Sequence, residues 1–214
     1  MSYFRELPNF EYQSPFANST GASDYVTAKN VFRRMKLRDD LKNVFTLFNK
    51  RIIEEGERPD TIAEKEYGKS DLDWVVLLTA GIINVRNEWP LSSKNLYNFV
   101  VKKYGDDTNS VHHFETKEVK DSQNRLILPK GKVVDSNFTI PNPDQLNATL
   151  NPVVGISNYE FEVKENIKKS TISILRRSYL QQFLSDMKKE MTYKRSSQFV
   201  SNNLIRTENT KLTN

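Results

Sequence analysis

The sequence predicts an α+β fold: a small core of two helices flanked by strands, added β-hairpins, a C-terminal amphipathic helix and extended N- and C-terminal segments. Three patterns carry this prediction. Two short helical stretches separated by a glycine lie between residues 58 and 91. Strand-forming residues flank a polar turn cluster between residues 111 and 134. An apolar stripe with helical spacing runs through residues 178–191.

The pair of helices has clear start and stop signals. Pro59 suits a first helical turn because its missing N–H is not needed there, and Gly68 is a natural stop. Ser70 is expected to cap a second helix, Leu72 to Ala80, which Gly81 ends. That helix is apolar almost all round, so it must be buried on most sides. We expect the core of this module to be formed by Ile62, Tyr67, Trp74, Leu77 and Leu78.

The segments before and after the pair complete the first half of the chain. Residues 1–28 read as an irregular or extended arm with aromatic anchors, which either docks on a partner or packs on its own domain. The anchors are Tyr3, Phe4, Phe10, Tyr12 and Phe16. Residues 44–53 are rich in β-formers and predict a strand entering the module. A third helix follows Leu91 and stops at Gly105.

The second half alternates strands, loops and one helix. Residues 111–119 and 126–134 predict a β-hairpin, and the proline- and asparagine-rich residues 135–157 predict a loop. Tyr159, Phe161 and Val163 alternate with charged residues, which predicts a strand that turns at 165–169 and returns at 171–175. An amphipathic helix follows, and after Tyr193 we expect a basic, flexible tail.

These elements divide the chain into five segments. They are an extended arm (1–28), a core with its flanking strand and helix (29–105), a hairpin with a loop (106–157), a C-terminal hairpin with the amphipathic helix (158–193) and the tail (194–214).

Composition bounds the classes of function. The 214 residues include no cysteine, which excludes disulfides, thiolate metal sites and cysteine nucleophiles. No apolar run approaches the ~18 residues of a membrane span, and early charges and prolines distinguish the N-terminus from a signal peptide. The net charge of +5 is uneven, because residues 164–214 carry +7 and residues 1–163 carry −2. The absence of cysteine leads us to expect a chain that folds in a reducing cytoplasm.

A structural role explains each candidate motif better than catalysis, cofactor binding or metal binding does. Gly68-Lys69-Ser70 lacks the earlier glycine of a phosphate-binding loop, where Ala63 stands. His112 and His113 are adjacent, and adjacent side chains of a strand point to opposite faces, so the pair should not hold one metal ion. We expect no enzyme activity and assign no catalytic, cofactor or metal residue.

Aromatic residues outside the module are candidates for a partner interface. Trp89 suits either the core or an interface anchor, and the sequence leaves both readings open. Phe199 stands isolated in the tail and is a further candidate. The basic C-terminal region would suit nucleic acid, but Tyr179 and Phe183 fall on or near the apolar stripe of the helix, so packing explains them better.

The chain also carries a family resemblance. The order of a strand, Pro59 to Ala63, Tyr67-Gly68, a helix with Trp74 and then Ile82 to Asn84 resembles a LysM-type βααβ module. Together with other segments it resembles the LysM-like baseplate wedge subunit of T-even-type contractile-tailed phages, the gene product 53 family. The further matching segments are Phe4, Leu7–Asn9, Glu11–Tyr12, Val31–Arg34, Asp39–Leu41, Phe45–Phe48, Glu88–Ser92, Val111–Thr116, Ser157–Glu160 and Tyr179–Leu184.

The resemblance implies a structural, non-catalytic protein of the virion, assembled in the host bacterial cytoplasm. Such a subunit would clamp neighbouring wedges to each other and to the central hub, in multiple copies per baseplate ring. The implied partners are other wedge proteins (the inner-ring wedge core and the sheath-like wedge protein) and hub or tube-initiator proteins, with no membrane. The main alternative is a peptidoglycan- or glycan-binding LysM protein, and a basic protein associated with nucleic acid is a second rival.

Overall fold

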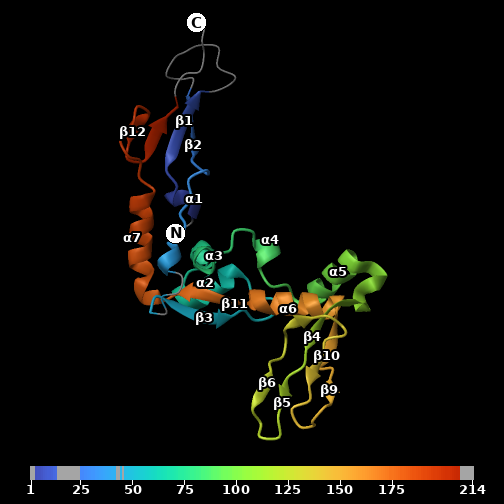
Figure 1. Cartoon of the computed structure of the whole chain (residues 1–214). Helices are drawn as coiled ribbons and strands as arrows, with labels where there is room; N and C mark the ends of the chain where they lie inside the picture. The colour runs from blue at the N-terminus through green and yellow to red at the C-terminus, as the bar shows by residue number, and fades with distance from the viewer. Residues whose placement is uncertain (1–2, 14–24, 42–43, 45, 208–214) are drawn as a thin grey trace. The chain divides into compact units, whose positions relative to one another are not determined.

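The computed structural model describes residues 3–13, 25–41, 44 and 46–207, and it has a mixture of helices and strands, as predicted (Figure 1). The chain forms two compact units. The first unit comprises residues 1–52, 57–88 and 172–214, and the second comprises residues 53–56 and 89–171. The second unit is thus an insertion between two parts of the first.

The helical pair of the first unit forms as the sequence predicts, with one correction. Helix α2 (Pro59–Tyr67) ends at Gly68 with φ 74°, and α3 (Asp73–Ala80) ends at Gly81 with φ 76°. Both glycines are left-handed, a conformation that L side chains disfavour. A 3-10 turn, η3 (Ser70–Leu72), precedes α3, so Leu72 and not Ser70 holds the cap position of that helix, and no side chain caps it.

Two strands flank this pair. Strand β3 (Phe48–Ile52) pairs with β11 (Thr171–Leu175). Backbone bonds from Arg176 N to Leu47 O (2.9 Å) and from Ile53 N to Ser170 O (2.8 Å) show that the two strands are antiparallel. Both strands were predicted, but not that they pair with each other. The residues 82–84 after α3 form no strand.

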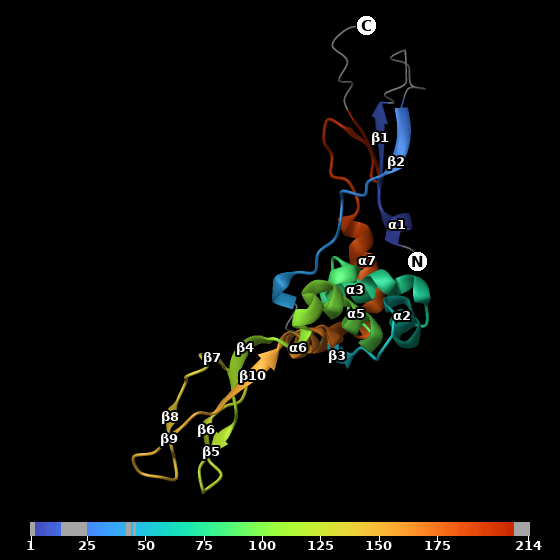
Figure 2. The same ribbon diagram turned by 90° about the vertical axis from the view of Figure 1, so that its right-hand side faces the viewer.

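The two ends of the chain form one sheet with the strand order β12-β13-β1-β2 (Figures 1 and 2). The short helix α1 (Tyr3–Glu6) precedes β1 (Asn9–Gln13), which lies antiparallel to β2 (Tyr25–Lys29) and parallel to β13 (Leu204–Arg206). Strand β12 (Phe199–Ser201) completes the sheet. The prediction of a flexible tail is therefore wrong for these strands, because β1 supplies the neighbour that an isolated tail would lack.

Helix α7 (Leu180–Glu190) is the predicted amphipathic helix, and the 3-10 turn η5 (Arg177–Tyr179) leads into it. Leu180, Met187 and Met191 are buried, while Phe183 and Leu184 on the same stripe are half-buried. The described part of the first unit also contains the short η2 (Asp39–Leu41) and α4 (Val85–Glu88).

The second unit contains the main error of the sequence interpretation. Residues predicted as a strand and turn form α6 (Asn158–Ser170), which packs on α5 (Ser93–Tyr104) and on the 3-10 turn η4 (Gly105–Asn109). A capping box starts α6: the Glu160 N–H donates to the Ser157 hydroxyl (3.2 Å), and the Ser157 N–H donates to the Glu160 carboxylate (2.9 Å). The predicted C-terminal hairpin therefore does not exist.

The strands of the second unit form three small sheets. Strand β4 (Val111–Thr116) lies between β10 (Val153–Ser157) and β7 (Val133–Val134). The pairing of β4 with β7 is the inner part of the hairpin predicted for residues 111–119 and 126–134. Its outer part is the separate pair β5 (Val119–Lys120) and β6 (Leu126–Leu128). The predicted loop 135–157 is wrong in part, since it contains β8 (Ile140–Pro141), β9 (Thr149–Leu150) and β10.

Candidate partner interface

Three aromatic rings from distant parts of the sequence meet in the first unit. The ring centroid of Trp74 on α3 lies 5.6 Å from that of Tyr3 on α1 and 6.0 Å from that of Phe183 on α7. Trp74 itself is only 8% exposed. Stacked and tilted aromatic pairs of this kind stabilise a fold beyond the area they bury. The cluster therefore fixes α1, α3 and α7 around one point.

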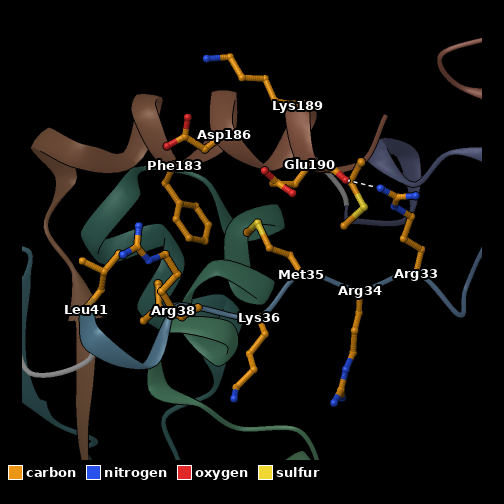
Figure 3. A pocket seen from close by; sticks show the side chains of 12 residues that line it. Arg33, Arg34, Met35, Lys36, Arg38, Leu41, Phe183, Asp186, Lys189 and Glu190 are labelled. Carbon is orange, nitrogen blue, oxygen red and sulfur yellow. Dashed lines mark hydrogen bonds between the residues drawn. The ribbon is translucent and has the colours of Figure 1, made fainter. Parts of the chain in front are cut away.

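An extended segment, residues 33–38, borders this cluster. Along it, half-buried Arg33, Met35 and Leu37 alternate with exposed Arg34, Lys36 and Arg38. The Arg33 guanidinium holds one end of the segment, because it donates to the carbonyl oxygens of Glu190 (2.7 Å) and Thr192 (3.0 Å). Figure 3 shows Met35 pointing towards α7 while Arg34 and Lys36 extend away from that helix.

A hollow lies between this segment and α7 (Figure 3), and we call it the Phe183 hollow. Its volume is about 620 Å³. Phe183, Leu41 and Met35 give it an apolar floor, but its charged lining has both signs, with Asp186 and Glu190 on α7 among several basic residues. Its electrostatic character is therefore mixed.

A second hollow, the Trp74 groove, lies between the same segment and α3. It has a volume of about 400 Å³. The apolar lining comes from α3 and its exit and from the segment: Trp74, Leu77, Leu78, Ile82, Ile83, Met35 and Leu37. The charged lining residues are Arg34 and Lys36, and no acidic residue lines this groove in the described part of the chain. The groove thus combines an apolar wall with a cationic rim.

The residues predicted to meet a partner lie in different environments. Phe4 is 62% exposed, whereas Phe10 and Tyr12 on β1 are half-buried with ring centroids 5.6 Å apart. Phe199 on β12 is also half-buried. Trp89 is 9% exposed and belongs to the buried residues. Phe16 lies outside the described residues.

The residues predicted as module core divide into two groups. Ile62, Tyr67 and Trp74 are buried, and the Tyr67 hydroxyl donates to the Leu175 carbonyl (3.0 Å), which ties α2 to β11. Burial raises the pKa of this hydroxyl well above its ordinary value. Leu77 and Leu78 are only half-buried, because they line the Trp74 groove.

Sequence reasoning missed the residues opposite these leucines. Met35 and Ile83 line the groove, yet neither stands in a predicted helix or strand. The period-two alternation of basic and apolar residues over 34–38 was the available signal, since it marks an extended segment with one covered face. Ile83, which is 73% exposed, had no such pattern around it.

The two histidines also depart from the prediction. Their Nδ1 atoms lie 2.9 Å apart, although adjacent strand residues should diverge. The reason is an irregular register: Ile156 pairs with His113 but Ser157 pairs with Val111, which leaves His112 as the extra residue of a bulge. His112 stacks on Phe161 with ring centroids 3.9 Å apart.

A buried carboxylate completes this cluster. Glu115 on β4 is hydrogen-bonded to His113 Nε2 (3.0 Å) and to Lys164 on α6. The bond from Lys164, together with that from His113, outweighs burial and lowers the pKa of Glu115. In the described residues, His, Asp and Glu side chains nowhere gather in the groups of three or more that a metal ion would need. The cluster therefore joins β4 to α6.

The sequence of the chain matches a known protein family. The sequence pattern of base plate wedge protein 53 matches residues 4–190 of the chain. No individually curated protein matches it in sequence. Over the part of the chain that the structure describes, none of the helices combines the length and apolar character needed to cross a bilayer. Because the match covers most of the chain and runs through both units, the chain belongs to the base plate wedge protein 53 family, whose members are structural proteins of the phage tail baseplate.

Proposed function

We propose that this protein clamps neighbouring baseplate wedges to each other and to the central hub. One observation carries the proposal: large apolar side chains are exposed on both compact units. Phe4, Phe32 and Ile83 of the first unit are 62%, 88% and 73% exposed, and Val133 and Leu146 of the second are 71% and 96% exposed. Contiguous exposed apolar patches mark protein-binding surfaces, and the proposal assigns these five side chains to such patches.

A clamp of this kind gains strength from several weak contacts. When one unit has bound, the other is held at a high effective concentration near its own partner. The combined affinity then exceeds that of either contact alone. The partners proposed are the inner-ring wedge core, the sheath-like wedge protein and the hub or tube-initiator proteins, met by multiple copies of this chain in each ring. Assembly in the host cytoplasm and a non-catalytic role belong to the same proposal.

The arm and the tail remain proposed contact segments, together with Tyr3, Phe4, Phe10, Tyr12, Phe16, Trp89 and Phe199. Since β1 pairs with β13, the two ends form one sheet, and deleting either would expose an edge of the other. Arg206 Nε donates to the Glu11 carboxylate across this pair (2.7 Å). We therefore treat the sheet as one contact surface, and exposed single residues test it more cleanly than deletions.

We further propose that β3, α2, α3 and β11 form a LysM-like βααβ core. Their order along the chain and the antiparallel pairing of the two strands support this. Residues 89–170 would then be an insertion between the second helix and the second strand. A glycan-binding role remains the alternative, and a pull-down of the full chain with purified peptidoglycan tests it, since retention would favour that role.

The decisive experiment is a cryo-electron-microscopy reconstruction of baseplates from the phage that encodes this chain. We expect density for it at the junction between wedges, in contact with at least two other subunits. It would be paired with Phe32→Glu and Leu146→Glu, which place a charge on one exposed residue of each unit and should reduce incorporation into particles. Particles that lack the chain, or that hold it at one isolated contact, would contradict the clamp.

A further inference from the structure

Strand β2 is an open edge of the sheet that the two chain ends form (Figure 1). It stands last in the strand order, and in the described part of the chain it pairs with β1 alone. The opposite edge, β12, has three residues and a register irregularity between Phe199 and Ser201. β2 has five residues that pair with β1 in unbroken register. Short or bulged strands protect the edges of natural sheets, so β12 is protected in this way and β2 is not.

The backbone groups of Thr27, in the middle of β2, point away from β1. Just beyond the end of β2, the Asn30 N–H donates to the Pro8 carbonyl (2.9 Å). Hydrogen-bonded and non-hydrogen-bonded pairs alternate along an antiparallel ladder. The pairs that lack these bonds are therefore Lys29 with Asn9, Thr27 with Glu11 and Tyr25 with Gln13.

The other side of β1 agrees with this alternation. The Asn9 N–H donates to the Asn203 carbonyl (2.8 Å), and the Glu11 carbonyl accepts from the Thr207 N–H (2.8 Å). Both residues thus turn these backbone groups away from β2 and towards β13. The β2 residues opposite them turn theirs to the free edge, where a further strand could bond to them.

The charged side chain of β2 does not protect this edge. Lysine on an edge strand commonly discourages the addition of another strand. The ammonium group of Lys29 is already engaged, because it donates to the carbonyl oxygens of Leu7 (2.8 Å) and Arg5 (3.2 Å). Both acceptors precede β1, so the side chain reaches back towards the start of that strand.

The register also determines which side chains an added strand would lie beside. Residues directly opposite one another share a face of the sheet. One face is apolar or aromatic and uncharged, with Phe10, Tyr12, Val26, Ala28, Phe199 and Ile205. Thr27 lies on the other face, where Arg206 is bonded to Glu11. A strand that matches both faces must alternate apolar and polar residues.

We infer that β2 pairs with an extended segment of a different baseplate subunit, which adds a fifth strand to this sheet. The segment bonds to the outward backbone groups of Tyr25 and Thr27. Its apolar side chains extend the face of Val26 and Ala28, and its polar side chains lie on the side of Thr27. In this binding mode main-chain bonds hold the segment and alternating side chains select it. The inference rests on the proposed function, because it names the chemistry of one of the clamp's contacts.

The size and symmetry of the contact favour a different subunit over a second copy of this chain. Five residues of a strand span only about 17 Å, and the next strand lies about 4.8 Å away. Interfaces that hold two proteins on their own bury about 1,200–2,000 Å², which one pair of short strands does not approach. Pairing of β2 with β2 would also close a two-fold dimer, whereas a ring of copies needs contacts between unlike surfaces. A subunit that meets the clamp elsewhere as well stays bound.

Photo-crosslinking in assembled particles tests the occupant directly. Thr27, which is exposed, is replaced by p-benzoylphenylalanine, baseplates are purified and irradiated, and crosslinked peptides are identified by mass spectrometry. The matched control is the same replacement at Val200, which is 47% exposed on the bulged edge strand β12. We expect position 27, and not position 200, to crosslink to a segment of another subunit in which apolar and polar residues alternate.

The other outcomes each overturn the inference. A crosslink within this chain would show that its own residues cover the edge, and a crosslink to a second copy would show self-pairing. A crosslink to a segment without the alternation, or none at position 27 in particles that contain the chain, would reject the added strand. In these cases the proposed clamp still stands. Particles without the chain would reject both proposals.

A proline at position 27 tests the backbone bonds themselves. Thr27→Pro removes the N–H that faces the free edge, and edge strands tolerate proline where the N–H faces outward. Thr27→Ala is the matched control, because it changes the side chain and keeps the N–H. We expect Thr27→Pro to lower incorporation into baseplates on the order of tenfold relative to Thr27→Ala, with similar melting temperatures for the two purified chains. Equal incorporation would overturn the inference, and a lower melting temperature of Thr27→Pro alone would contradict the outward direction of this N–H.

Discussion

Lys103 Nζ donates a hydrogen bond of 2.6 Å to the Glu162 carboxylate, joining α5 to α6 within the second unit. The Tyr104 hydroxyl donates to the same oxygen (2.9 Å). Burial of Glu162 opposes its ionisation, but these two bonds outweigh burial and lower the pKa of its carboxyl group. Asn158 and Asn166, four residues before and after Glu162, also bond out of α6: Asn158 Nδ2 donates to the Asp107 carbonyl (2.8 Å) and Asn166 Nδ2 to the Leu91 carbonyl (2.9 Å).

Replacing Glu162 should destabilise the fold in a pH-dependent way. Glu162→Gln loses a charge-assisted hydrogen bond, which we expect to lower the free energy of unfolding by about 1–2 kcal/mol at pH 7. Because the folded pKa lies below the unfolded value of about 4.3, this contribution is present above that pH and is lost as the pH falls through the folded pKa. Urea unfolding of both chains between pH 3 and 7 measures it. A difference that grows towards low pH would contradict this assignment.

Replacement of two isoleucines of the first unit by alanine should change the free energy of unfolding by very different amounts. Ile62 is fully buried, so Ile62→Ala should lower the free energy of unfolding by about 2–5 kcal/mol through lost burial and a cavity. Ile83 is mostly exposed, so Ile83→Ala should change it by less than ~0.5 kcal/mol. Denaturant unfolding of the purified chain measures both. A large effect of Ile83→Ala would mean that this side chain packs within the isolated protein.

Removal of residues 194–214 should loosen β1 without melting the helical core. The Asn9 N–H donates to the Asn203 carbonyl (2.8 Å), and the Thr207 N–H donates to the Glu11 carbonyl (2.8 Å). With the tail removed, we expect the Asn9 amide to exchange faster in hydrogen-exchange mass spectrometry, while α2 and α3 stay protected. The control is removal of residues 208–214 only, which leaves β13 intact. Equal exchange in both truncated chains would refute the β1–β13 pairing.

The capping box predicts a further stability change. Ser157→Ala removes the acceptor for the Glu160 N–H, and loss of such a cap costs about 1 kcal/mol. Ser157→Asp keeps an acceptor at that position and should restore most of the loss. Thermal unfolding monitored by circular dichroism compares the three chains. Equal destabilisation by Ala and Asp would show that the hydroxyl acts through packing and not as a cap.

The misinterpretation of residues 158–170 has a physical reason. The alternation of Tyr159, Phe161 and Val163 suggested a strand with one apolar face. In the structure the face of α6 that meets its neighbours carries polar groups at helical spacing, with Glu162 among them. A polar face is stable inside a protein only when specific partners satisfy it. Those partners, Lys103, Tyr104 and Leu91, lie far away in sequence, so periodicity could not reveal them.

The candidate interface was predictable only in part. The apolar character of α3 indicated that it needs cover, but the extended segment beside it was missed, although basic and apolar residues alternate over 34–38. Which residues would stand opposite Leu77 and Leu78 could not be inferred, because the groove forms from two segments that do not neighbour each other in sequence. The exposed face of α3 could be identified only from the structure, which shows the face that is buried.

The sequence by itself determined the family, the α+β class and the helices whose ends have local signals. Pro59, Gly68 and Gly81 mark those ends through backbone geometry that depends on each residue alone. The tertiary structure decided which strands pair, as when β1 finds β13 and β3 finds β11. Such pairings depend on chain segments brought together from a distance, and a strand's own residues do not specify its neighbour. That is why the sequence predicted an extended arm at one end and a flexible tail at the other, whereas the described parts of the two ends form one sheet.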